Sequence, residues 1–169
     1  MILKIDNLKK LAAAVWLICL VVLSATGFGP WLVLHKRLTG YWLMVHVTFA
    51  PVFALCTAVL AVMYAHNLSF DKKDWLFLLR IFRRRNANKE TVGNGSVIVM
   101  KVCFWLICVS ALPLFLSSVL SMFPLFGTEG QEILFQTHRY SALLLSLAAI
   151  LHTYLVIKIQ AQMRQQSNM

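Results

Sequence analysis

Residues 133–157 read ILFQTHRYSALLLSLAAILHTYLVI, a run in which Arg139 is the only Asp, Glu, Lys or Arg residue. An α-helix rises about 1.5 Å per residue, so about 20 mostly apolar residues cross the hydrocarbon core of a bilayer. Three further runs have this length and character: residues 11–34, 41–65 and 97–123. The sequence therefore predicts an all-α membrane protein, a bundle of four transmembrane helices that forms a single membrane domain over residues 1–169.

Charge is scarce in this chain and unevenly placed along it. Of the 169 residues, 60% are hydrophobic and 13% are charged, whereas about a quarter of the residues of a soluble domain are charged. Most of the lysines and arginines behind the net charge of +10 precede the first run, follow the fourth, or lie between the second and third. By the positive-inside rule, both termini are therefore predicted to be cytoplasmic. Since basic residues have this orienting role, we do not expect nucleic-acid binding.

The first run has an alternative interpretation as a secretory signal peptide, because Lys4, Lys9 and Lys10 precede it. However, the run is longer than the 7–15 apolar residues of a signal-peptide core, and no small-residue cleavage site follows it. We therefore expect a retained transmembrane helix.

The connector between the second and third runs, residues 67–96, is the longest polar stretch. Within it, residues 71–85 read DKKDWLFLLRIFRRR, where apolar residues recur at three- and four-residue steps among basic ones. This pattern is typical of a short amphipathic helix that lies in the headgroup plane, with Trp75 as its interfacial anchor.

The four cysteines lie inside the apolar runs, and none belongs to a C-x-x-C spacing. Covalently attached c-type haem, thiolate-ligated zinc, an iron–sulfur cluster in this chain and a disulfide framework are therefore not expected.

Histidines inside the apolar runs are the main candidates for a functional site. His46 lies about five residues into the second run and His138 about five residues into the fourth. Because both runs are predicted to start on the outer side, the two imidazoles are expected at similar depth, where they can supply both axial ligands of one haem iron. An ionisable residue within a membrane span is by default a functional hypothesis. The alternative for each histidine is a hydrogen-bonded packing residue.

His152 follows His138 by 14 residues on the same predicted helix. The two are about 21 Å apart along the axis and, at about 100° per residue, nearly on the same face. One helix could thus contribute a ligand to each of two haems stacked across the membrane. Arg139, beside His138, could pair with a haem propionate.

A partner for His152 at a second haem is missing from the expected depth. His66 follows His46 by 20 residues, so it is about 30 Å further along the helix and rotated by about 200°. His35 is expected on the outer side. His66 and His35 are therefore interpreted as interfacial residues.

Several short motifs carry a resemblance to a known family. They are Thr26-Gly27, His46, Asp74-Trp75, Lys101-x-x-Phe104-Trp105, and His138 followed after thirteen residues by His152-Thr-Tyr154. Together they resemble the four-helix cytochrome b family, which includes the gamma subunits of formate dehydrogenase and the cytochrome b subunits of nickel–iron hydrogenase and thiosulfate reductase. The resemblance extends over all four predicted helices.

The resemblance implies an outer haem b held by His46 and His138, and an inner haem b held by His152 and a histidine that usually precedes a Trp near the start of the first helix. Here residues 12–15, before Trp16, read AAAV and cannot ligate iron. The family's asparagine-glycine-glutamine pattern at its quinone pocket is also replaced, by VIVM at residues 97–100.

The function that the resemblance implies is electron transfer, since two imidazole ligands leave haem iron without an open position. The chain would be a multi-pass subunit of a respiratory oxidoreductase complex in a bacterial inner membrane. It would pass electrons between a quinone pool and an extramembrane partner of the iron–sulfur or cytochrome c type. The first alternative is a membrane anchor that has lost part or all of the haem chain. The second is a transporter or a small assembly factor.

Overall fold

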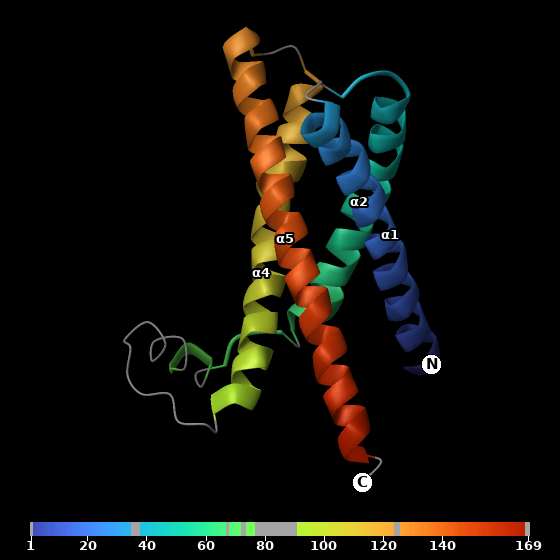
Figure 1. The fold of residues 1–169 in the computed structure, drawn as a ribbon, viewed down its shortest axis with the longest axis vertical. Helices are drawn as coiled ribbons and strands as arrows, with labels where there is room; N and C mark the ends of the chain where they lie inside the picture. The colour runs from blue at the N-terminus through green and yellow to red at the C-terminus, as the bar shows by residue number, and fades with distance from the viewer. Residues whose placement is uncertain are drawn as a thin grey trace. The chain divides into compact units, whose positions relative to one another are not determined.

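The computed structural model describes residues 2–34, 38–66, 68–71, 74–76, 91–123 and 126–167. Within these ranges the chain is helical and contains no β-strand. The long helices are α1 (Ile2–Leu34), α2 (Gly40–Ala65), α4 (Thr91–Ser121) and α5 (Thr128–Ser167) (Figure 1).

Each long helix contains a stretch that is long and apolar enough to cross a membrane. These stretches are Asn7–Val33, Gly40–Ala65, Gly95–Ser121 and Thr128–Gln166. The prediction of an all-α protein with four helices of transmembrane length is therefore confirmed, and the chain has the character of a multi-pass membrane protein in contact with lipid.

The helices extend beyond the predicted apolar runs. α1 begins at Ile2 rather than near residue 11, and α5 continues to Ser167 rather than ending near residue 157. The added segments are rich in lysine and glutamine, which are good helix formers. An apolar window locates the part of a helix that can lie in the bilayer, whereas the helix itself continues wherever its residues favour it.

α4 ends at Ser121, two residues before the end of the third predicted run, residues 97–123. The amides of Met122 and Phe123 donate to the carbonyl oxygens of residues three positions back, each over 3.2 Å. Such bonds tighten the last turn of a helix. Phe123 also precedes a proline in the sequence, and the residue before a proline disfavours helical geometry.

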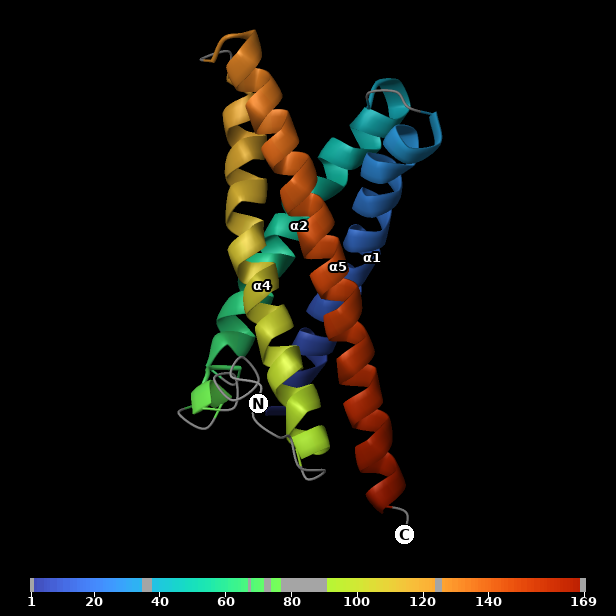
Figure 2. The same cartoon turned by 60° about the vertical axis from the view of Figure 1, so that its left-hand side comes forward.

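The chain divides into two compact units, Met1–His66 and Asn67–Met169. In the first, α1 packs antiparallel to α2, and in the second, α4 packs antiparallel to α5; Figures 1 and 2 show the partners side by side in both views. Gly40 begins α2 with a φ of +61°, a left-handed conformation that glycine adopts without steric cost. The predicted single domain concerns how the two units sit together, and it stays a prediction.

Buried polar side chains in both units are hydroxyls that bond to their own helix. Each donates over 2.7 to 3.0 Å to a carbonyl oxygen three or four residues earlier: Thr26, Thr57, Ser110 and Ser117. In the described part of the chain no buried side-chain nitrogen or oxygen lacks a hydrogen-bond partner. A lipid environment requires that polar groups form their hydrogen bonds within the protein, because lipid offers none of its own.

The predicted amphipathic helix over residues 71–85 falls largely outside the described residues. Its described part includes one helical turn, residues 74–76. His35 likewise lies outside them.

Candidate functional site

His46 of α2 is held by two adjacent residues of α1. Its Nδ1 lies 2.9 Å from the hydroxyl oxygen of Thr26, which is itself buried. At Gly27, a Cβ atom would lie only 3.1 Å from His46 Cε1. The imidazole therefore occupies the space that the missing side chain of Gly27 leaves beside the helix.

His138 of α5 contacts α4 in a similar way. Its Nδ1 lies 2.9 Å from the hydroxyl oxygen of Ser118. The next residue, Arg139, has its guanidinium carbon 4.6 Å from the centre of the Phe135 ring, a cation–π geometry. The pairing of Arg139 with a haem propionate stays a prediction.

His152 also faces α4, further along α5. Its Nδ1 lies 3.0 Å from the backbone carbonyl oxygen of Met100. A carbonyl oxygen can only accept, so Nδ1 carries the proton and, in the neutral ring, Nε2 carries the lone pair. The Phe104 ring lies beside this imidazole, with the two ring centroids 6.3 Å apart.

The three candidate ligands share one arrangement: a group on the neighbouring helix of the same unit binds Nδ1. Histidines that ligate a metal through Nε2 characteristically have their other ring nitrogen hydrogen-bonded, which fixes the tautomer and the ring orientation. The residues present therefore fit a metal bound through Nε2. Because haem iron takes four ligands from its porphyrin, it asks the protein for only one or two.

The histidines belong to different units. His46 lies in the first unit, whereas α5 carries His138 and His152 on one uninterrupted helix of the second. The predicted pairing of His46 with His138 joins the two units, and it stays a prediction. Sequence reasoning did not identify Ser118 and Met100 as partners, and no sequence signal marks them. Thr26-Gly27 was noted as a motif, although its contact with His46 was not predicted.

Trp16, which follows the position of the inner haem ligand in the resembling family, is a packing residue. The Trp16 ring stacks on Phe53 with ring centroids 5.6 Å apart, and its indole N–H donates to Thr57 Oγ1 over 2.8 Å. Trp16 is only 8% exposed. Residues 12–15, AAAV, offer His152 no iron-ligating partner.

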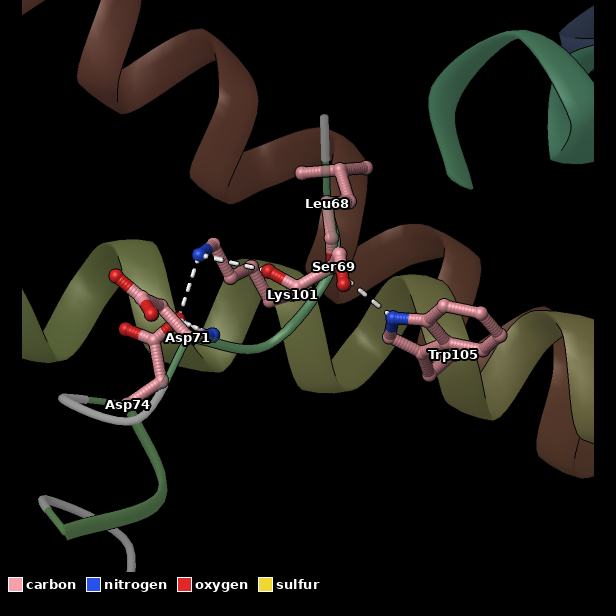
Figure 3. Close-up of polar contacts among 6 residues, drawn as sticks. All are labelled: Leu68, Ser69, Asp71, Asp74, Lys101 and Trp105. Atoms are coloured by element: carbon pink, nitrogen blue, oxygen red, sulfur yellow. Dashed lines mark hydrogen bonds and ion pairs between the residues drawn. The ribbon is translucent and has the colours of Figure 1, made fainter. Parts of the chain in front are cut away.

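Lys101 and Trp105, one turn apart on α4, hold the chain that leads into the connector (Figure 3). The Lys101 ammonium lies 2.6 Å from Asp74 Oδ2 and donates over 3.2 Å to the Ser69 carbonyl. The Trp105 indole donates over 3.0 Å to the Leu68 carbonyl. We refer to these five residues as the connector clasp.

The charge on Asp74 is stabilised within the connector clasp. Its Oδ2 accepts from Lys101 and, over 3.0 Å, from the backbone amide of Asp71. The hydrogen bond from Lys101, followed by the backbone bond, lowers the pKa of this carboxyl below its usual value. Three residues of the family-like motifs, Asp74, Lys101 and Trp105, thus have a structural role.

Other metal chemistry has no obvious ligand set in the described residues, where no group of three His, Cys, Asp or Glu side chains is placed to hold an ion. The four cysteines are free thiols.

Comparison of the chain with protein-family models, with curated proteins and with solved structures finds no match. The resemblance to the four-helix cytochrome b family therefore rests on the quoted motifs, and the function is argued from the residues themselves.

Proposed function

We propose that this chain is a b-type cytochrome membrane subunit of a respiratory oxidoreductase complex. The observation that carries the proposal is the shared arrangement of the three intramembrane histidines, each with Nδ1 bound by a neighbouring helix. In this proposal His46 and His138 would hold the iron of haem b. When bound, haem supplies a one-electron carrier between a quinone pool and a partner subunit of the iron–sulfur or cytochrome c type.

The chain's own residues have four roles in this proposal. His46 and His138 present Nε2 to the iron, and Thr26 and Ser118 orient their rings. Arg139 offers a positive charge for a propionate. The apolar helices exclude water, which tunes the reduction potential through burial. Both termini are on the cytoplasmic side of a bacterial inner membrane, in agreement with the distribution of basic residues.

A second candidate function is a membrane anchor for such a complex that has lost part of its redox chain. The packing of Trp16 against Phe53 and Thr57 favours it, because the family's inner ligand precedes this tryptophan. His152 would then be a packing residue bonded to Met100, and the chain would hold one haem or none.

An optical spectrum of the full chain, purified from its native membrane, tests the proposal. We expect a reduced b-type α-band that is lost in His46→Ala and in His138→Ala. His66→Ala is the matched control, since His66 is an exposed residue at the end of α2. It should retain the band. The proposal fails if the native protein contains no haem, or if the band survives both ligand substitutions.

A further inference from the structure

The Thr26 hydroxyl has one proton and three polar neighbours. Its oxygen lies 2.8 Å from the Val22 carbonyl oxygen, 3.3 Å from the Leu23 carbonyl oxygen and 2.9 Å from His46 Nδ1. Two oxygens approach to 2.8 Å only with a hydrogen between them, so the hydroxyl proton is donated to the carbonyl. The contact with His46 must then be made by a proton on Nδ1, with the Thr26 oxygen as acceptor.

From this geometry we infer that Thr26 is a positioning residue that keeps the neutral His46 ring in its Nδ1–H tautomer. In that tautomer Nε2 carries the lone pair that a metal requires. The role of this lone pair toward haem iron rests on the proposed function, whereas the tautomer follows from the contacts of Thr26 within the first unit.

A second pair in the same unit has this arrangement with an unambiguous donor. Thr57 Oγ1 donates to the Phe53 carbonyl over 2.7 Å and accepts from the Trp16 indole N–H over 2.8 Å. An indole nitrogen can only donate, so the direction of this bond is fixed. α1 and α2 thus exchange the same contact in both directions, each threonine accepting an N–H from the other helix.

Gly27 complements Thr26 by fixing the place of the ring. A Cβ atom at Gly27 would lie only 3.1 Å from His46 Cε1, so the imidazole lies close against α1 where any side chain at this position would begin. The Thr26 hydroxyl holds Nδ1 of the ring, and α1 at Gly27 limits the motion of Cε1. The direction of Nε2 is therefore set by two adjacent residues of one helix.

The other two histidines show why the inference is specific to Thr26. The Met100 carbonyl already fixes the tautomer of His152, and a backbone group cannot be removed by substitution. At His138 the contact with Ser118 leaves the donor open, and the ring also has a hydrogen bond to the Leu114 backbone, so substitution of Ser118 would not isolate one effect. Only at Thr26 does a side chain fix the ring proton in a way that mutation can test.

The first experiment measures the tautomer without haem. The full chain is produced under haem-deficient conditions with ¹⁵N-labelled histidine, and the ring nitrogens of His46 are assigned from the signals that His46→Gln loses. We expect a protonated Nδ1 in the wild type and in Thr26→Ser, which keeps the hydroxyl. Thr26→Val, which keeps the shape but not the hydroxyl, should shift the ring toward Nε2–H.

Two matched controls separate this effect from a general loss of stability. Thr57→Val removes the equivalent cross-helix hydrogen bond to Trp16, and Thr48→Val removes a hydroxyl that donates to the Met44 carbonyl on the same helix as His46. Neither should change the His46 tautomer. A protonated Nε2 in the wild type, or an unchanged tautomer in Thr26→Val, overturns the inference.

The second experiment measures the haem-loaded chain. Removal of a hydrogen bond behind a metal ligand typically weakens binding about 10- to 100-fold, so Thr26→Val should release haem to a competing apoprotein more readily by a factor of this order. The weaker ligand should favour the ferrous state, and a tenfold change in the ferrous-to-ferric ratio corresponds to about 59 mV. Thr26→Ser should keep the wild-type haem release and the wild-type ferrous-to-ferric ratio. If both quantities are unchanged in Thr26→Val, the inference fails.

The two experiments keep this inference and the proposed function apart. If His46→Ala leaves a haem spectrum unchanged, the proposed ligation fails, while the NMR experiment still decides the tautomer. If the NMR result contradicts the Nδ1–H tautomer, the role of Thr26 fails, although His46 can remain a ligand.

Discussion

Trp16 of α1 and Thr57 of α2 are joined across the first unit by a 2.8 Å hydrogen bond from the indole nitrogen to the hydroxyl oxygen. Thr57 is buried, and the indole ring also stacks on Phe53, one turn earlier on α2. A tryptophan that the family-like pattern associates with an inner haem ligand is thus a packing residue of a helical pair here.

Loss of this bond should destabilise the first unit by a modest amount. Interhelical hydrogen bonds in membrane proteins contribute about 0.6 kcal/mol on average and about 1.7 kcal/mol at most. We expect Thr57→Val and Trp16→Phe to lower the free energy of unfolding, with a coupling energy in this range because both remove the same bond. A double-mutant cycle from titration of the protein with denaturing detergent measures it. Strictly additive effects would contradict the prediction, and Thr48→Val serves as the control.

Separation of Lys101 from Asp74 should open the connector clasp locally. The amides of Asp74 and Trp75 donate to the Asp71 carbonyl over 3.0 and 3.2 Å, so their hydrogen exchange reports on this turn. In Lys101→Met a loss of about 1 kcal/mol corresponds to roughly fivefold faster exchange. Lys101→Arg, which retains the charge, should preserve most of the protection. Equal protection in Lys101→Met and the wild type would contradict the prediction.

The turn in which the amides of Asp74 and Trp75 bond to Asp71 should lose hydrogen-exchange protection at acidic pH. Because the pKa of Asp74 is lowered in the folded protein, its stabilising contribution is fully present above the usual carboxyl pKa of about 4 and is lost as the pH falls through the lower folded value. Protection of the Asp74 and Trp75 amides, corrected for the intrinsic pH dependence of exchange, should therefore be constant from pH 7 to about 5 and fall below about 4. Asp74→Asn should abolish this dependence. A loss of protection already near neutral pH would contradict the assignment.

The four helices could be predicted from the sequence because the thickness of a bilayer fixes the length of an apolar run. The ends of α1 and α5 could not, since helix propensity in polar segments lies outside that rule. The histidines were also identified in advance, as polar residues inside spans. Their partners Thr26, Ser118 and Met100 were not assigned, because such a contact depends on the register between two helices, which no local pattern encodes.

The contacts of the connector clasp could not be predicted from the sequence either, although several of its residues could be named. Asp74, Lys101 and Trp105 were all named in motifs, yet the motifs did not relate them to one another. Their contact follows from the path of the chain after α2, where backbone carbonyls of Leu68 and Ser69 meet α4. A sequence motif can therefore identify residues correctly without indicating what they bind.

The haem content should be close to one per chain, and His152→Ala should leave it unchanged. The residues that precede Trp16 offer no iron ligand that could pair with His152 at a second haem. His138→Ala, a matched substitution on the same helix, should remove the haem. The pyridine haemochrome absorbance, divided by the protein concentration, measures the ratio. A ratio near two that falls to one in His152→Ala would mean that a second site exists.

Substitution of Gly27 should disturb His46, whereas substitution of Gly29 should not. A Cβ at Gly27 would lie 3.1 Å from His46 Cε1, but a Cβ at Gly29 meets nothing within 4 Å. Both glycines are inside α1, where glycine is less favourable than alanine by about 1 kcal/mol. Gly29→Ala should therefore be neutral or stabilising and leave the haem spectrum unchanged. In Gly27→Ala the imidazole must shift, so we expect altered ¹⁵N ring signals of His46 in the haem-free chain and a lower haem occupancy at limiting haem. If the two alanine variants behave alike in both measurements, the contact between Gly27 and His46 does not hold the ring.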